Sequence, residues 1–149
     1  CSLGGSPFSW NSNWKILECH IKRHMHEKMT SKICGRLLKK NWNLYDPSLA
    51  PQEGGIYCIG EEQQIIYVGM SKNIQSRLRK HKSNNSQEIG KHVKKMFNDG
   101  KQDRLGIKWV LIPDHKCKEG EYLACIENKL GYWPKFNMQR GNACTPCGN

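Results

Sequence analysis

The chain has 149 residues, of which 37% are apolar, and a formal net charge of +11 from 24 Lys and Arg against 13 Asp and Glu. That length predicts one domain with one modest hydrophobic core, and the low apolar fraction predicts a very polar surface. No apolar run is long enough to cross a bilayer, which excludes a membrane-spanning helix. The excess of positive charge favours a polyanionic partner, nucleic acid first and an acidic membrane surface second.

The first half of the chain is predicted to hold a basic helical extension, a connector and a hairpin. Residues 1–12 are rich in Ser, Gly and Asn and predict a loose tail, and residues 13–40 predict one or two basic helices. The helical spacing is carried by large apolar residues, namely Trp14, Ile16, Leu17, Ile21 and Met25. Residues 45–55, with two prolines and two glycines, predict a connector. Residues 56–59 and 65–68 then predict two strands of a hairpin around the turn "GEEQQ".

The second half is predicted to add helices and one more strand. Residues 73–82 predict a helix, and residues 86–99 predict another, with Ser86 as its N-cap and Gly100 as its stop. In the segment "RLGIKWVLIP" alternate residues are apolar, so Leu105, Ile107, Trp109 and Leu111 should share one face of a third strand.

Residues 119–130 predict a last helix, and residues 132–149 an irregular tail. We therefore expect an α+β, sandwich-like fold with a small, mostly antiparallel three-stranded sheet flanked by helices.

Several different short motifs follow one another along this region. Gly55-Ile56-Tyr57 stands on the first hairpin strand and Tyr67-Val68-Gly69 on the second. Arg77 follows eight residues after that glycine, His81 four residues later, and "PKFN" ends the region at Asn137. These elements resemble the GIY-YIG nuclease superfamily, with Val68 in place of the usual isoleucine. The resemblance covers residues 54–137 and implies a nuclease domain over 51–140, a tail and basic helical extension over 1–50, and a tail over 141–149.

The helix after the hairpin carries the predicted phosphate-binding side chains. Asn73, Arg77 and His81 are spaced four residues apart and so line one stripe of that helix, although a surface helix gives a similar pattern. Gly69, at the end of the second strand, lacks a side chain and would let a backbone or a phosphate approach closely.

Two glutamates compete for the metal position that the resemblance implies on the last helix. With Leu123 as the origin and about 100° per residue, Glu127 falls within roughly 40° of it and lies on the inward-facing side. Glu121 falls on the far side, where we expect it to be exposed to solvent. An inward carboxylate needs a cation, either a metal or a basic side chain. We favour Glu127 as the metal ligand, with Glu121 as the alternative.

The chemistry of phosphodiester hydrolysis assigns roles to the remaining residues. The divalent cation would be Mg²⁺ or Mn²⁺, because hard cations prefer oxygen ligands. Arg77 would grip the scissile phosphate, and Tyr57 would take or relay the proton of the attacking water, with His81 orienting Tyr57 or serving as the base. Tyr67 would shape the pocket, and Asn137 would fix the glutamate helix or the substrate backbone.

We expect DNA as the partner and no membrane. The residues predicted to contact nucleic acid are Gly69, Lys72, Asn73, Arg77, Arg79 and Lys80. The basic residues of the N-terminal helix, among them Lys15 and Lys22, could also lie along a duplex.

Eight cysteines leave the redox state and the compartment open. The chain begins at Cys1, so we expect a processed product or an excised fragment. Cys58 and Cys125 lie in apolar segments and are predicted as small core residues. The pair Cys144 and Cys147 has zinc-ligand spacing, but a disulfide or two unrelated thiols fit it at least as well. An intracellular location, nuclear or cytoplasmic, and secretion are both compatible with this content.

Two other functional classes stay open. The first is a GIY-YIG-like module that binds nucleic acid without cutting it; the presence of Arg77, Glu127 and both tyrosines argues against it. The second is a secreted, disulfide-linked basic effector, which the even cysteine count favours.

Overall fold

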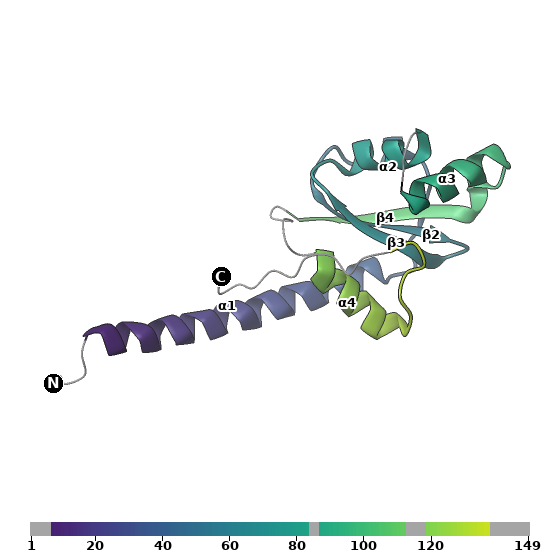
Figure 1. Cartoon of the computed structure of the whole chain (residues 1–149). Coiled ribbons are helices and arrows are strands. Elements are labelled where there is room, and N and C mark those ends of the chain that lie inside the picture. The colour runs from purple at the N-terminus through teal and green to yellow at the C-terminus, as the bar shows by residue number, and fades with distance from the viewer. Residues whose placement is uncertain (1–6, 84–86, 113–118, 138–149) are drawn as a thin grey trace.

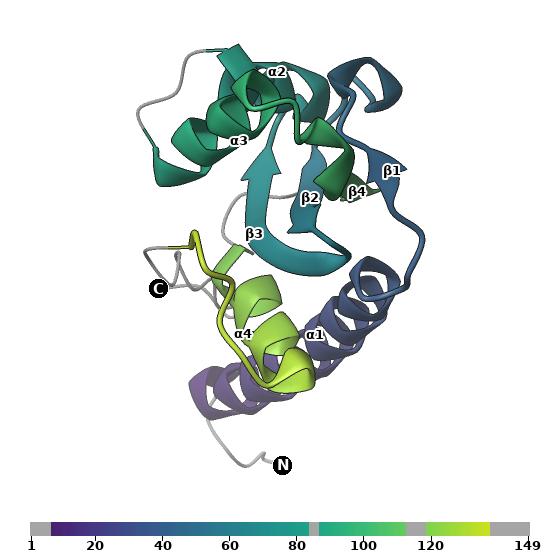
Figure 2. The ribbon, with the colours of Figure 1, turned by 90° about the vertical axis from the view of Figure 1, so that its right-hand side faces the viewer.

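The computed structural model describes residues 7–83, 87–112 and 119–137 and places a four-stranded antiparallel sheet between two layers of helices (Figures 1 and 2). The predicted α+β class is confirmed. The sheet order is β1-β4-β2-β3, so the hairpin strands β2 (Gly55–Glu61) and β3 (Gln64–Ser71) form one side. Strand β4 (Leu105–Leu111) pairs with β2 along its whole length.

The fourth strand, β1 (Asn43–Leu44), was not predicted. It pairs with Ile107 and Gly106 at the outer edge of β4. Two residues are too few to show a period of two in the sequence, so only the edge of β4 defines this strand. It is followed by a short 3₁₀ helix, η1 (Pro47–Leu49).

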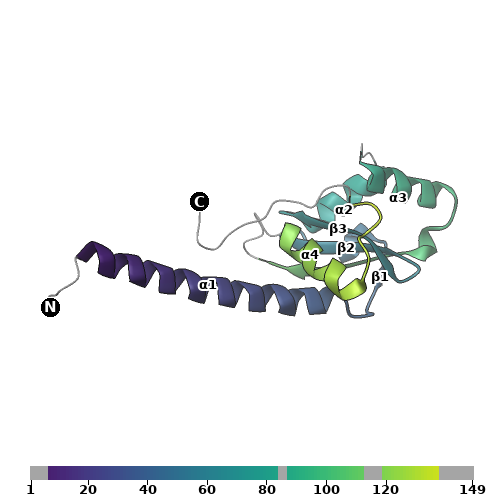
Figure 3. The ribbon, with the colours of Figure 1, turned by 60° about the horizontal axis from the view of Figure 1, so that its bottom comes forward.

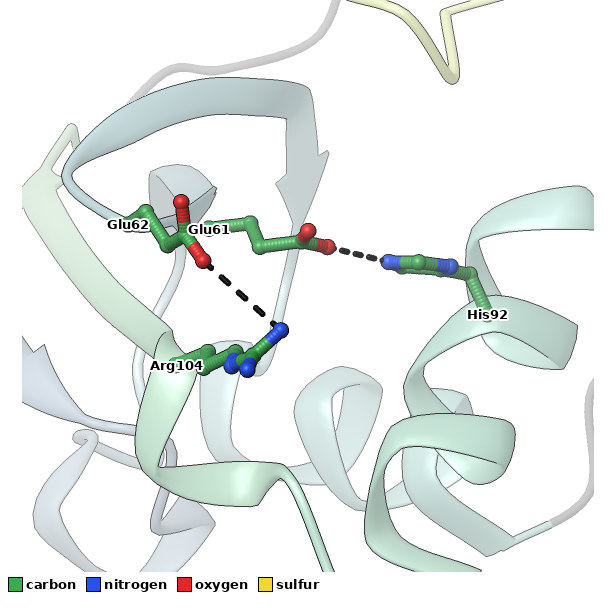
Figure 4. A network of polar contacts seen from close by, with 4 residues as sticks. All are labelled: Glu61, Glu62, His92 and Arg104. Carbon is green, nitrogen blue, oxygen red and sulfur yellow. Dashed lines mark hydrogen bonds and ion pairs between the residues drawn. The ribbon is translucent and has the colours of Figure 1, made fainter. Parts of the chain in front are cut away.

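The turn of the β2–β3 hairpin lies at the predicted "GEEQQ". Glu62 and Gln63 have φ of 51° and 68°, the two consecutive left-handed residues of a tight hairpin. Figure 4 shows how neighbouring elements hold the turn: Glu61 contacts His92 at 2.5 Å, and Glu62 contacts Arg104 at 3.8 Å. Arg104 ends the 3₁₀ helix η2 (Gln102–Arg104), which leads into β4.

Helices α2 (Ile74–Ser83) and α3 (Glu88–Asn98) cover one face of the sheet (Figure 2). The buried residues Ile74 and Leu78 of α2 and Ile89 and Val93 of α3 pack there against the sheet. The predicted N-cap Ser86 lies outside the described residues. Gly100, with φ of 71°, follows α3 and confirms the predicted stop.

The opposite face is covered by α4 (Glu119–Leu130) and the end of α1 (Pro7–Leu37). Ile33, Cys34 and Leu37 of α1 pack with Leu123 and Ile126 of α4 in the second apolar cluster. The C-terminal part of the predicted extension is therefore built into the core.

Helix α1 is one continuous helix, and it begins earlier than expected. Residues 7–12 are helical, so the prediction of a loose tail over 1–12 is wrong for that part. Proline is compatible with the first turn of a helix, because its missing N–H needs no partner there. The N-terminal half of α1 projects beyond the sheet and α4 (Figure 3). Among the described residues, no helix is long and apolar enough to cross a membrane.

Candidate active site

A buried tyrosine–histidine pair lies between the sheet and α2. Tyr57, in the central strand β2, is 1% exposed, and His81, in the last turn of α2, is fully buried. The Tyr57 hydroxyl lies 2.8 Å from Nε2 of His81. The hairpin positions the tyrosine, and the apolar residues Ile74 and Leu78 dock the helix that carries the histidine.

Burial keeps both members of this pair neutral. Burial raises the pKa of Tyr57 well above its ordinary value of 10.0, an effect that Tyr67 reinforces and Arg77 opposes. Burial also lowers the pKa of His81 from 6.5 to about 4, with Arg77 and Lys80 acting in the same direction. A neutral imidazole nitrogen is the better acceptor of the two groups, so we assign the Tyr57 hydroxyl as the donor to Nε2.

Tyr67 completes an aromatic cluster with this pair. Its ring lies 6.1 Å from the ring of Tyr57 and 5.5 Å from that of His81, the latter edge-on. The register of the hairpin shifts here: Ile59 pairs with Tyr67 and Gly60 with Ile65, which leaves Ile66 as the extra residue of a β-bulge. The bulge places Tyr67 on the same face as Tyr57. No signal in the sequence predicted it.

Gly69 is required for a different reason from the one we expected. A Cβ atom at this position would lie 2.6 Å from the Tyr57 hydroxyl and 2.8 Å from the Tyr67 ring. The ring of Tyr57 therefore occupies the space in which the sequence predicts a phosphate or a backbone. The glycine lets the two tyrosines share the face of the sheet.

Arg77 lies half-buried on α2, one turn before His81. Its positive charge acts on both members of the pair, since it lowers the pKa of Tyr57 and that of His81. The predicted stripe thus brings Arg77 and His81 together. Asn73 has a structural task at the start of the same helix, because its side-chain oxygen accepts from the N–H of Ser76 at 2.9 Å.

The remaining basic residues predicted to contact nucleic acid lie on the surface near this helix. Lys72, Arg79 and Lys80 are all exposed. Lys80 is close enough for its charge to lower the pKa of His81.

Asn137 binds strand β3 from outside the sheet. Its side chain accepts from the N–H of Val68 and donates to the C=O of Val68, both at 2.8 Å. The neighbouring N–H of Phe136 donates to the C=O of Ile66 at 2.9 Å. Asn137 is 6% exposed and acts as a substitute strand residue along the outer edge of β3. Asn137 thus ties the segment that follows α4 to β3, a contact that favours the first predicted role, in which Asn137 fixes the glutamate helix.

Glu127 and Glu121 lie in different surroundings on α4. Glu127 is half-buried and follows the fully buried Ile126. The prediction that Glu121 is exposed is wrong: its side chain is 22% exposed and pairs with His26 of α1. Helix α1 packs along α4 and covers that side. Helix α4 lies on the opposite face of the sheet from Tyr57 and α2 (Figure 2).

The cysteines that the structure describes lie mainly in the core. Cys34 and Cys58 are buried and free, and burial raises the pKa of each thiol to about 12. Cys125 is free and packs against the same cluster, so both predicted core cysteines are confirmed. Cys19 is disulfide-bonded. Cys144 and Cys147 lie outside the described residues, which contain no cluster of three or more potential metal ligands.

Comparisons with known proteins show to which family of proteins this chain is similar. The model of the GIY-YIG catalytic domain matches residues 53–130. Two solved structures of the GIY-YIG N-terminal endonuclease domain of UvrC from Thermotoga maritima align with 62% of this chain and 91% of theirs. One, a Tyr-to-Phe variant described as bound to its catalytic divalent cation, is 26% identical with a TM-score of 0.39; the other is 24% identical with the same TM-score. No curated protein matches the sequence.

The family model covers more than half of the chain, from the strand that holds Tyr57 to the helix that holds Glu127. This chain belongs to the GIY-YIG nuclease family.

Proposed function

We propose that this protein is a metal-dependent endonuclease that hydrolyses phosphodiester bonds of DNA. The observation that carries the proposal is the Tyr57–His81 hydrogen bond of 2.8 Å beside Tyr67, with the charge of Arg77 acting on both partners. A purely structural hydrogen bond would not need a nearby guanidinium. In a family of nucleases, a buried proton-transfer pair next to a cation fits phosphate chemistry.

The oxygen ligands of the candidate site suit a hard divalent cation that is held mainly by the substrate and by water. Glu127 offers one half-buried carboxylate, and the described residues hold no cage of three ligands. Mg²⁺ binds in this way, through one or two carboxylates, several waters and phosphate oxygens. We assign Glu127 as the protein ligand, because it falls on the inward-facing side of α4 next to the buried Ile126. The carboxylate of Glu121 faces α1, where it pairs with His26. When bound, Mg²⁺ or Mn²⁺ would supply charge neutralisation at the phosphate and the leaving oxygen.

Tyr57 and His81 would move the proton of the attacking water as a relay. The Tyr57 oxygen accepts the proton of the water while its own proton passes to Nε2 of His81. A relay suits this site because the burial of Tyr57 makes a free phenolate costly, as its raised pKa indicates. The negative phosphate held beside Arg77 would stabilise the imidazolium that forms on His81.

Arg77 would hold the scissile phosphate, since its planar fork can bind two phosphate oxygens. Lys72, Arg79 and Lys80 would contact the flanking DNA backbone, together with Asn73. These contacts supply affinity and position but carry no sequence information.

The test is cleavage of a supercoiled plasmid with Mg²⁺ or with EDTA. We expect nicking that requires the metal and falls by a factor of at least about 100 in Arg77→Ala and in Glu127→Gln. Arg104→Ala, which removes an exposed arginine at the hairpin turn, is the matched control and should cut normally.

Other outcomes would change specific parts of the proposal. If Glu127→Gln still cut and Glu121→Gln did not, the metal ligand would be Glu121. If the wild type bound DNA but cut no form of it, we would conclude that the protein is a DNA-binding module and not an enzyme.

A further inference from the structure

Helix α1 carries large apolar side chains that no other element of the described residues covers. Besides Ile16 (56%), which lies apart from the others around the helix, five of them are more than half exposed: Trp14 59%, Leu17 52%, Ile21 51%, Met25 65% and Met29 56%. At about 100° per residue they fall within an arc of roughly 120°, and we call this set the α1 stripe. Single exposed apolar residues need no explanation, but five along one face, with Glu18 and Lys28 as the charged residues among them, mark an interaction surface.

The α1 stripe is not the face by which α1 joins the domain. The core residues Ile33, Cys34 and Leu37 point roughly 150° away from the stripe around the helix axis. The pair His26–Glu121 also belongs to that domain-facing side. Helix α1 therefore has two apolar faces, one buried against α4 and the sheet and the other open to a partner.

We propose that the α1 stripe pairs with the α1 stripe of a second copy of this chain, with the two helices antiparallel and their two-fold axis at Ile21. In this register Leu17 faces Met25 of the other copy. Trp14 then lies level with Lys28 of the other copy, where a cation–π contact can form. The stripe from Trp14 to Met29 spans about 22 Å of helix.

Charge along the stripe is self-complementary in this orientation. Glu18 and Lys22 lie at one edge of the stripe, Glu18 just inside its arc and Lys22 just outside, and they pair with each other at 3.2 Å within a copy. The two-fold axis brings the same flanks together, so Glu18 of each copy comes within roughly 3 Å along the axis of the level of Lys22 of the other. Two reciprocal ion pairs can then form across the interface.

The antiparallel orientation also separates the charged bodies. The stripe lies in the middle of α1, and the folded domain is attached at the C-terminal end of the helix (Figure 3). Antiparallel pairing places the two domains at opposite ends, which lowers the repulsion between two chains of charge +11. It also aligns the two helix dipoles in opposite directions, which is the favourable arrangement. A single pair of helix faces makes a small interface, so we expect a dissociation constant on the order of micromolar.

The test is sedimentation velocity of the full chain over a wide range of concentration. We expect a concentration-dependent dimer for the wild type and a monomer for Ile21→Glu. Ile16→Glu is the matched control, because Ile16 is 56% exposed on the same stretch of helix but lies about 160° from the stripe. It should dimerise like the wild type. Circular dichroism of both variants checks that α1 is still formed.

The register is tested by a photoreactive benzoylphenylalanine in place of Ile21 or Trp14. We expect cross-links from position 21 to land near Ile21 of the other copy and those from position 14 near Lys28. A wild type that stays monomeric throughout, or an Ile16→Glu variant as monomeric as Ile21→Glu, would overturn the proposal. So would a monomer whose stripe binds phosphatidylserine vesicles or a DNA duplex and loses that binding in Ile21→Glu, because the stripe would then serve that surface.

Discussion

His81 shows how burial sets the chemistry of one residue. An exposed histidine would be partly charged near neutral pH, whereas His81 is fully buried and neutral. Its neutral Nε2 can accept a hydrogen bond from the Tyr57 hydroxyl because burial and the charges of Arg77 and Lys80 keep the ring unprotonated. The same burial makes the stability of the fold depend on pH.

We predict that His81 destabilises the fold in acid. Its pKa is about 4 in the folded state against an ordinary 6.5, so the unfolded chain binds the proton more readily between these values. Stability that is present above pH 6.5 is therefore lost as pH falls towards about 4, by roughly 3 kcal/mol in total. Urea unfolding across this range should show a steeper loss for the wild type than for His81→Gln. Parallel losses in the two proteins would contradict the lowered pKa.

At the scale of the element, strand β3 depends on a segment far from it in the sequence. In the sheet order β1-β4-β2-β3, no strand among the described residues lies beside its outer edge. The segment that follows α4 covers this edge through Phe136 and Asn137, and the ring of Phe136 stacks on His92 of α3 at 4.8 Å. The segment thereby ties both helical layers to the strand that carries Tyr67.

We predict that Asn137→Ala lowers the free energy of unfolding by roughly 2–4 kcal/mol, because it leaves the N–H and the C=O of Val68 without their side-chain partner in a buried site. Amide exchange at Val68 should quicken at the same time. Asn137→Asp keeps an acceptor for the N–H but turns a carboxylate oxygen towards the C=O of Val68 in a buried site, so its effect should be at least as large. Asn128→Ala, at an exposed position of α4, is the control. Unchanged exchange at Val68 in Asn137→Ala would show that the strand edge does not need this residue.

At the scale of the whole molecule, the charge of +11 is the dominant property. Basic residues on α2 stand beside the candidate site, and others lie on α1 and α3. Such a distribution favours long-range attraction to a polyanion, which salt screens.

We predict that DNA affinity, measured by fluorescence anisotropy in EDTA so that no cleavage occurs, falls steeply with salt. Contact with about five phosphates gives a slope of log K against log salt near −4 to −5. Lys80→Ala should reduce the slope by about 1, and Lys101→Ala, at an exposed position away from α2, should not. A salt-independent affinity would exclude the proposed backbone contacts.

The sequence by itself determined the local elements and the centre of the site. The hairpin, α2 and α4 were predicted because alternation, turn residues and helical spacing are local properties. One hairpin and the helix that follows it contain Tyr57, Tyr67, Arg77 and His81. Because these residues are close in the sequence, their order in the chain nearly determines that their side chains lie together. Their catalytic roles stay predictions.

Only the tertiary structure decided the contacts between distant segments. Asn137 and Val68 are 69 residues apart, and His26 and Glu121 are 95 apart. The bulge at Ile66, the short strand β1 and the open face of α1 likewise depend on what packs beside them. A local pattern fixes the type of an element, but the burial of a side chain is a property of the surface that covers it, and that surface comes from elsewhere in the chain.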